Sequence, residues 1–255
     1  MIIEPPCQEH FPALRRLWKE AFGDTDDFLD TFGQTAFHPG RCRCVTVEGE
    51  TVAALYWFDC AYRAHSIAYL YAIATAEAYR GRGLCRALME DTHRHLKQLG
   101  YKGTVLVPGS EELFEFYKKM GYQICGCVKE FSCSPSADGI ELQRIDRKEY
   151  ENLRQHFLPA NGITQENENT VFLQTMATFY AGEKFLLAAR KEKDTLYGIE
   201  LLGDQALAPA IVKSLDCAKG KFRTPGVDKP LAMYHSLSKE VMALPIYFGL
   251  AFDEF

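Results

Sequence analysis

The first residues of this chain alternate between apolar and polar positions with the period of a helix. Apolar residues from Phe11 to Phe22 recur at helical spacing and end at Gly23, which is typical of one buried helix face. Asp24 is a residue type that favours the N-cap of a helix. It predicts a second helix over the apolar positions Phe28, Leu29 and Phe32.

Strand-like runs follow these two helices. Cys42–Glu48 and Thr51–Tyr62 flank a polar turn and predict a hairpin. The run Ser66–Thr75 (SIAYLYAIAT) is almost wholly apolar or aromatic, as in a strand that is buried on both faces. A helical pattern then begins at Leu84 and ends at Gly100.

Three further elements and a polar loop complete the first half. The elements are a strand at Gly103–Val107, a helix at Glu111–Met120 capped by Ser110, and a strand at Tyr122–Phe131. With a short strand at Met1–Glu4, the predicted order is β-α-α-β-β-β-α-β-α-β. The loop at residues 132–139 (SCSPSADG) indicates a boundary between a domain at 1–138 and a domain at 139–255.

The second half repeats the opening pattern in outline. Its predicted elements are a strand at Glu141–Ile145, helices at Glu149–Phe157 and Thr170–Tyr180, a hairpin of Lys184–Ala189 and Thr195–Leu202, a helix at Ala206–Cys217, and strands at Phe222–Thr224, Leu231–Leu237 and Ile246–Phe252. A strand, two helices and a hairpin also open residues 1–62, so we interpret the chain as a tandem of two similar domains. The second half is interpreted as a wall of the substrate cleft that sets specificity, and a scaffold or a dimer surface is the alternative role.

Composition narrows the classes of function. A net charge of −5 argues against a surface for nucleic acid. No apolar run reaches the ~18 residues of a membrane span, and the N-terminus lacks a signal sequence, so a cytoplasmic protein is expected. Nine cysteines include the pairs Cys42/Cys44 and Cys125/Cys127, whose C-x-C spacing indicates packed thiols and no metal site.

A glycine-rich turn between the apolar strand and its helix predicts an anion site. Residues 79–86 read YRGRGLCR. The first turn of a helix leaves backbone N–H groups unpaired and carries the positive end of the helix dipole. Glycines let a phosphate approach that backbone, and Arg80, Arg82 and Arg86 add positive charge. The sequence therefore predicts a pyrophosphate cradle.

Two common phosphate-binding motifs do not fit this turn. No GxxxxGK[ST] string follows the strand, and a GxGxxG fingerprint would need a glycine where Arg86 stands. The turn instead resembles the acyl-CoA signature [RQ]xxGx[GA] of the GCN5-related N-acetyltransferases (GNAT). Arg80 and Gly83 match it, whereas Cys85 departs from the final small residue. FYKKMGY at 116–122 is similar to the second cofactor motif of this family, and the element order of residues 1–135 is that of its fold.

The resemblance implies an α+β fold with a mixed sheet, the GNAT acyl-CoA N-acyltransferase fold, followed by a second GNAT-like domain. It also implies an N-acetyltransferase that moves an acetyl group from acetyl-CoA directly to a primary amine of a small molecule or peptide. The residues implied to bind acetyl-CoA are Ile73, Ala74, Thr75, Arg80, Gly81, Arg82, Gly83, Leu84, Cys85, Arg86 and Ser110. Tyr117 matches the tyrosine that protonates the departing CoA thiolate.

The general base is open at this point. Family members often carry a carboxylate on the strand before the glycine turn, but residues 66–72 contain none. Water, Asp59, Glu130 or the chain end (Glu254 or the Phe255 carboxylate) are the alternatives. Tyr69 and Tyr71 are interpreted as core or as walls of the substrate cleft. The remaining candidates are three histidines that we expect at the surface, namely His65, His93 and His95.

A second class of function is a non-catalytic CoA-binding regulatory module. The missing strand carboxylate and Cys85 both favour it. No nucleic-acid or membrane partner is expected, and a homodimer is left open. The identity of the amine acceptor is not specified by any residue pattern.

Overall fold

A computed structural model describes residues 1–239 and 243–252. The chain forms two compact units. Unit 1 comprises residues 1–123 and the segment that begins at Tyr234, and unit 2 comprises residues 124–233 and the segment that begins at Ala243. This division differs from the expected boundary at 138/139. The reason is that strand β6 (Gln123–Cys133) pairs with β12 of unit 2, from Cys133 opposite Gly220 to Val128 opposite Pro225.

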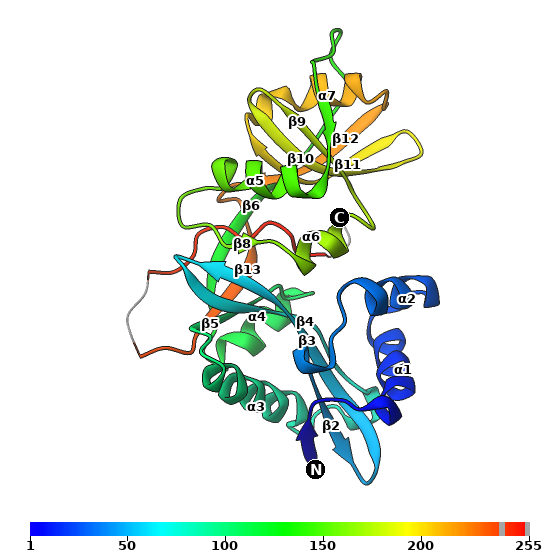
Figure 1. The fold of residues 1–255 in the computed structure, drawn as a ribbon, viewed down its shortest axis with the longest axis vertical. Coiled ribbons are helices and arrows are strands. Elements are labelled where there is room, and N and C mark those ends of the chain that lie inside the picture. The colour runs from blue at the N-terminus through cyan, green and yellow to red at the C-terminus, as the bar shows by residue number, and fades with distance from the viewer. Residues whose placement is uncertain (240–242, 253–255) are drawn as a thin grey trace. The chain divides into compact units, whose positions relative to one another are not determined.

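Unit 1 contains a mixed sheet between two layers of helices (Figure 1). Its elements are β1 (Ile2–Glu4), α1 (Phe11–Phe22), α2 (Asp26–Thr35), β2 (Cys42–Val47), β3 (Glu50–Tyr62), β4 (His65–Thr75), α3 (Leu84–Gln98), β5 (Gly103–Leu106) and α4 (Glu111–Lys118). The strands lie in the order β1-β2-β3-β4-β5. Neighbours are antiparallel except for β4 and β5, which are parallel.

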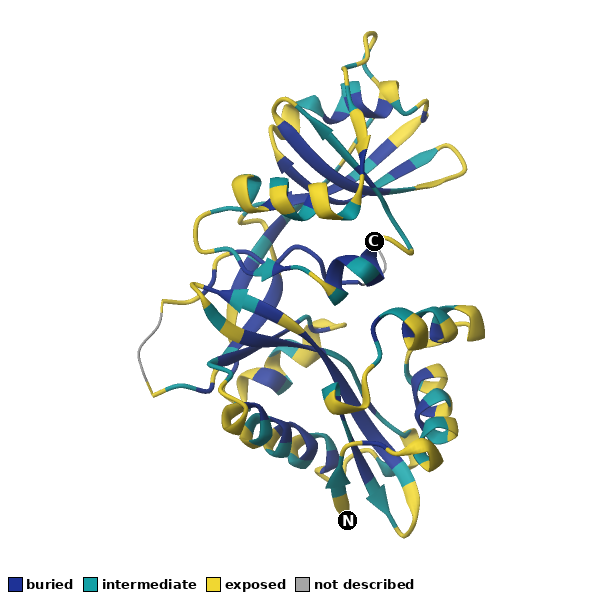
Figure 2. Cartoon of the chain, in the orientation of Figure 1, coloured by how far each residue is buried: buried dark blue, intermediate teal, exposed yellow. Residues whose placement is uncertain are grey.

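The two faces of this sheet are distinguished by the side chains of β3. Trp18 of α1 packs on Tyr56, with ring centroids 5.0 Å apart, whereas His95 of α3 packs on Trp57 at 6.1 Å. Since successive strand residues point to opposite faces, α1 and α3 cover opposite sides. The middle of β3 and of β4 is therefore buried (Figure 2).

The second helix of unit 1 begins one residue later than the sequence predicted. Thr25, not Asp24, is its N-cap, because Thr25 Oγ1 accepts a hydrogen bond from Phe28 N at 3.2 Å. Asp24 Oδ2 instead accepts from Trp18 Nε1 at 2.6 Å. Asp24 thus fixes the end of α1 rather than the start of α2.

Unit 2 repeats the order and the strand directions of unit 1. Its elements are β6, β7 (Gln143–Ile145), α5 (Arg147–Phe157), β8 (Thr164–Gln165), α6 (Glu168–Leu173), β9 (Thr178–Gly182), β10 (Phe185–Glu192), β11 (Thr195–Gly203), α7 (Ala208–Ser214), β12 (Lys219–Pro225) and β13 (Lys229–Ser236), whose last residues from Tyr234 belong to unit 1. β7-β9-β10-β11 is an antiparallel run, and β12 is parallel to β11. The same pattern of strand directions runs from β1 to β5, so the strand arrangement of unit 1 occurs a second time in unit 2.

Two predicted elements of the second half are wrong. Residues 178–180 were assigned to a helix, but they open β9, where Phe179 pairs with Ala188 and with Ile145. Residues 246–252 were assigned to a strand, but they contain only an isolated bridge, between Tyr247 and Gly162. Glu254 and Phe255 lie outside the described residues.

A fully buried ion pair lies in the core of unit 2. Arg154 Nε and Nη2 donate to the two oxygens of Glu200 at 2.7 and 2.8 Å. The hydroxyls of Tyr150 and Tyr247 donate to the same carboxylate at 2.7 and 3.0 Å. Tyr247 is thus held by a polar contact with β11, and the segment is buried from Tyr247 to Phe252 without forming a strand. Within the described ranges no helix is long and apolar enough to cross a membrane.

Candidate functional site

The turn between β4 and α3 has an open backbone. Gly81 and Gly83 adopt φ of 74° and 76°, in the left-handed region that favours glycine. A Cβ atom at either position would meet nothing within 4 Å, so space is open beside the backbone. Gly83 is also the N-cap of α3, and Leu84 behind it is buried. The first turn of this 15-residue helix therefore has unpaired N–H groups beside open space, which is the geometry that an anion site requires.

The arginines of the turn stabilise its backbone and also supply positive charge. Arg80 Nε donates to the carbonyl oxygen of Thr75 at 3.1 Å, and Arg82 Nη2 donates to that of Ala78 at 3.0 Å. The Arg82 guanidinium also lies over the ring of Tyr79, 4.9 Å from its centroid. All three predicted arginines, including Arg86, are exposed. They keep positive charge around the cradle while two of them fix its backbone.

The predicted pantetheine strand separates from its neighbour before it ends. β4 pairs with β5 from Ile67 opposite Gly103 to Tyr69 opposite Val105, and then continues alone on that side to Thr75. Ala72 has a φ of 48°, and the register with β3 shifts at the same level. Such an irregularity bends a strand away from its partner. Ile73, Ala74 and Thr75 lie beyond the bend, where an extended arm could add to the strand edge.

Thr75 carries an unsatisfied polar atom at this strand end. Its hydroxyl oxygen is buried and has no hydrogen-bond partner among the described residues. Buried polar groups nearly always have such a partner. A ligand with amide and carbonyl groups, such as a pantetheine arm, would offer one, so the residues at this strand end fit an acyl-CoA.

Tyr117 lies on the same side of the sheet as the cradle. Its ring is 6% exposed, and burial, with Cys85 as a second cause, raises the pKa of its phenol. Burial likewise raises the pKa of the Cys85 thiol to about 11, so Cys85 is neutral at physiological pH. Tyr117 therefore keeps its proton.

Ser110 does not cap α4 with its side chain, contrary to the prediction. It occupies the N-cap position with an extended backbone, but its hydroxyl bonds to the Glu112 side chain and lowers the pKa of that carboxyl. Ser110 nevertheless begins the helix that carries Tyr117. No contact in the structure distinguishes it as a ligand-binding residue.

Both carboxylates that were weighed as general bases are held in ion pairs. Asp59 accepts from Arg41 Nη1 at 3.1 Å and from the hydroxyl of Tyr101. Glu130 of unit 2 accepts from Arg223 Nη2 at 3.0 Å and from Lys229 Nζ at 2.7 Å. Burial acts to raise the pKa of Glu130, but these two cations outweigh it and the pKa is lowered. Glu130 is therefore a weaker proton acceptor than an unpaired glutamate.

The three histidines that were expected at the surface differ in their surroundings. His65, His93 and His95 are all partly buried. His93 lies 2.8 Å from the hydroxyl of Tyr122, and burial, together with His235, lowers its pKa to about 3. The sequence signal for this contact is the spacing of four residues from Met89, which is fully buried on α3. Asp91 and Arg94, which flank His93 closely in the sequence, favour a surface position instead.

Tyr69 and Tyr71 belong to an aromatic cluster on the α1 face. Tyr71 packs on Trp18 and Phe58, with ring centroids 5.7 and 5.5 Å apart, and Tyr69 lies 5.8 Å from Tyr71. Tyr69 is 2% exposed and is a core residue, whereas Tyr71 is only partly buried. A role as a cleft wall is therefore restricted to Tyr71.

The first cysteine pair packs as predicted, because Cys42 and Cys44 are fully buried on β2. In the second pair Cys125 is buried and Cys127 is partly buried, and all nine cysteines are free thiols. In the part of the chain that the structure describes, no group of three or more His, Cys, Asp and Glu side chains could hold a metal ion.

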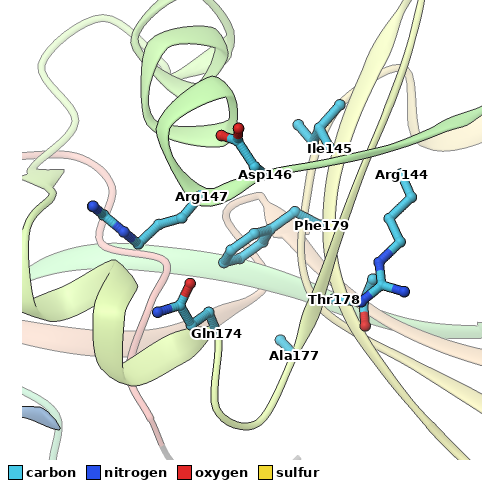
Figure 3. A pocket seen from close by; sticks show the side chains of 8 residues that line it. All are labelled: Arg144, Ile145, Asp146, Arg147, Gln174, Ala177, Thr178 and Phe179. Carbon is cyan, nitrogen blue, oxygen red and sulfur yellow. The ribbon is translucent and has the colours of Figure 1, made fainter.

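A separate hollow of about 570 Å³ lies in unit 2, at the start of α5 (Figure 3). None of the predicted site residues lines it. Asp146 at its edge caps α5 by accepting from Glu149 N at 2.9 Å, and Arg147 pairs with Glu151 at 2.6 Å. Two of its charged side chains are thus already engaged in local structure.

Comparisons with known proteins agree with this geometry. Residues 3–125 match the family model of the acetyltransferase (GNAT) domain. The fold is similar to that of a GCN5-related N-acetyltransferase from Kribbella flavida, with a TM-score of 0.72, 15% identity, and coverage of 91% of this chain and 70% of that chain. A GCN5-related N-acetyltransferase from Anabaena variabilis gives a TM-score of 0.71 and 16% identity, with coverage of 93% of this chain and 73% of that chain. A tandem GNAT protein from the clavulanic acid biosynthesis pathway gives a TM-score of 0.58 and 10% identity, with coverage of 94% of this chain and 99% of that chain. None of the curated proteins matches the chain.

Proposed function

We propose that this chain, which belongs to the GCN5-related N-acetyltransferase family through its acetyltransferase domain at residues 3–125, transfers the acetyl group of acetyl-CoA to a primary amine. The observation that carries this proposal is the open glycine turn at the N-terminus of α3, beside the strand edge that β4 leaves free of β5. Phosphates at the turn and a pantetheine arm along Ile73–Thr75 would place the thioester near the bend of β4. Acceptors in small molecules and in peptides both fit, and a cytoplasmic setting fits the free thiols.

The proposed reaction is a direct attack on the thioester. The amine nitrogen bonds to the carbonyl carbon, the C–S bond breaks, and the sulfur leaves with the electron pair. Tyr117 hydrogen-bonds to that sulfur and supplies its proton, and the phenol regains a proton from the water that accepts the proton of the amine, so the products are an N-acetyl amine and free CoA thiol. The proton lost by the amine leaves through water, because Asp59 and Glu130 are both ion-paired.

Unit 2 is proposed to lack a second acyl-CoA site. After β11 the chain places Asp204 where the cradle would be, and its Oδ1 accepts from Ala206 N at 3.0 Å. A carboxylate at this position repels phosphate. Beyond the last parallel pair of β11 and β12, the Thr224 hydroxyl donates to the carbonyl of Leu201 at 2.7 Å. The strand opening that is free in unit 1 is therefore bridged here.

Asp59 and Glu130 are both held in ion pairs, so neither is free to act as a general base. This observation favours one other candidate function, a CoA-binding module without catalysis. Release of CoA thiol from acetyl-CoA, measured with a thiol-reactive dye against a panel of primary amines, separates the two. Amine-dependent release at several turnovers per enzyme supports the transferase. Stabilisation of the protein by acetyl-CoA in thermal unfolding, without release for any amine, supports the module instead. Absence of both effects contradicts both candidates.

The pH dependence of turnover should reflect the amine and not Tyr117. A free primary amine is protonated below its pKa of about 10.4, so kcat/KM should rise with pH from 6 to 9. Because burial raises the pKa of Tyr117 above its ordinary value of about 10, ionisation of this residue should cause no loss of activity below pH 10. Initial rates in constant-ionic-strength buffers test this. A decline in kcat centred between pH 7 and 9 would contradict the assignment.

A further inference from the structure

A buried polar network lies directly behind Tyr117. The hydroxyl of Tyr122 sits 2.8 Å from Thr104 Oγ1 on β5 and 2.8 Å from His93 Nε2 on α3. Tyr122 is 2% exposed and Thr104 is fully buried. Since a buried hydroxyl without partners is costly, these two bonds specify where the Tyr122 ring can lie.

The network also reaches the last strand of unit 1. His235 stacks on His93, with ring centroids 4.6 Å apart and an interplanar angle of 11°, and its Nδ1 lies 3.1 Å from the carbonyl oxygen of Gly121. Gly121 adopts a φ of 86°, and a Cβ atom there would lie 3.2 Å from His235 Nδ1. The turn that ends α4 is therefore fixed from α3, from β5 and from the segment after Met233.

His93 and Tyr122 stay uncharged over the working pH range. Burial lowers the pKa of His93 to about 3, with His235 as the second cause. Burial raises the pKa of Tyr122 well above its ordinary value, although Thr104 acts in the opposite direction. Cys85 and Tyr117, the other titratable groups that influence Tyr122, are also neutral. The hydrogen bonds consequently persist wherever the enzyme is active.

Tyr122 is linked to Tyr117 in two ways. Its backbone N–H donates to the carbonyl oxygen of Tyr117 at 3.1 Å. Its ring meets the ring of Tyr117 edge to face, with centroids 5.7 Å apart at 62°. A shift of the Tyr122 ring is thus transmitted to the phenol of Tyr117 through both the main chain and the side chain.

We propose that Tyr122, held between Thr104 and His93, is a positioning residue that sets the place of the Tyr117 hydroxyl in acetyl transfer. This inference rests on the proposed function, because it requires Tyr117 to act on the leaving sulfur. A displacement of about 1 Å in a reacting group can lower a rate by up to about 100-fold. Loss of the Tyr122 hydroxyl keeps the ring and removes only its two anchoring bonds, so we expect kcat to fall by about 10-fold.

A double-mutant cycle tests the proposal. We expect Tyr122→Phe to lower kcat by about 10-fold with acetyl-CoA affinity within about 2-fold of the parent. In a Tyr117→Phe background the same change should alter kcat by less than about 2-fold, because the group that Tyr122 positions is already absent. Tyr234→Phe is the matched control, since it removes another buried hydroxyl of unit 1, one that bonds to Lys102 O at 3.4 Å. It should leave kcat unchanged.

A second pair of variants tests the same proposal if the Tyr122→Phe protein does not fold. Thr104→Val removes one partner of the Tyr122 hydroxyl and should lower kcat in the same way, whereas Thr104→Ser keeps the hydroxyl and should restore it. Equal loss of kcat by Tyr122→Phe in both backgrounds would show a general structural role and overturn the proposal, as would an unchanged kcat. An unchanged kcat for Tyr117→Phe alone would instead refute the general-acid step of the proposed function.

Discussion

Glu200→Gln is expected to lower the free energy of unfolding of unit 2 by about 3–5 kcal/mol. Glu200 is fully buried, and Arg154, its partner, is 2% exposed. Removal of the carboxylate charge leaves the guanidinium buried without compensation, and the hydroxyls of Tyr150 and Tyr247 lose a charged acceptor. Such a loss is a large fraction of the total stability of a domain of this size.

The chain allows the two units to be followed separately. Both tryptophans, Trp18 and Trp57, belong to unit 1, so their fluorescence reports that unit. Urea unfolding followed by far-UV circular dichroism, with hydrogen exchange of peptides from β10 and β11, reports unit 2. The matched control is Glu192→Gln, which breaks a pair between the exposed Glu192 and the partly buried Arg190 and should cost no more than about 1 kcal/mol. Equal stability of the Glu200 and Glu192 variants would contradict the prediction.

The same ion pair predicts the acid limit of stability. Burial acts to raise the pKa of Glu200, but the charge of Arg154 and the hydrogen bonds from Arg154, Tyr150 and Tyr247 outweigh it, so the pKa is lowered. A carboxyl with a lowered pKa in the folded state stabilises the fold above its unfolded pKa of about 4.3, and this contribution is lost as the pH falls through the folded value. The parent should therefore lose stability below about pH 4 more steeply than Glu200→Gln.

Local patterns predicted most of unit 1 because its element ends are marked by glycine. Gly23 ends α1 with a φ of 73°, and Gly100 and Gly121 follow α3 and α4 with φ of 93° and 86°. These signals depend only on neighbouring residues, so a single sequence contains them. The cradle at Gly81 and Gly83 is of the same kind, which explains why the candidate site was visible before the fold.

The wrong predictions concern segments whose state is decided by distant residues. Phe179 is spaced like a helix residue after Val171 and Phe172, yet its pairing with Ala188 and its stacking on Tyr150 at 4.2 Å place it in β9. Residues 246–252 are apolar like a strand, but Tyr247 is held by Glu200 at 3.0 Å, across 47 positions. Contacts over such separations leave no periodic signal.

The same reason explains what was missed at the site. The sequence assigns Tyr122 to a motif and His93 to the surface. Their side chains are nevertheless 2.8 Å apart, and no local pattern indicates a contact between residues that are 29 positions apart. Neither Thr104 nor His235 carries a local feature that marks it as a partner of Tyr122. The missing strand carboxylate was visible in the sequence, but the ion pairs that occupy Asp59 and Glu130 required the structure.

Tyr117→Phe is expected to lower kcat by about 10–1000-fold, the range for loss of a general acid, while acetyl-CoA still binds. The change removes one oxygen and keeps the ring contacts with Phe116 and Tyr122, at 5.2 and 5.7 Å. The cradle at Gly81–Gly83 is untouched, so the thermal stabilisation by acetyl-CoA should stay within about 1 °C of the parent. Steady-state release of CoA thiol at saturating amine measures kcat.

The raised pKa of Tyr117 determines when its proton moves toward the leaving sulfur. A phenol above its ordinary pKa of about 10 is a weaker acid than a thiol near 8.5, so complete transfer of the proton before the C–S bond breaks is unfavourable. The hydrogen bond gains strength only as negative charge develops on the sulfur, which is an interaction made in the transition state. Loss of the hydroxyl should therefore lower kcat and kcat/KM for acetyl-CoA equally. A raised KM with unchanged kcat would show instead that Tyr117 only packs against the bound thioester.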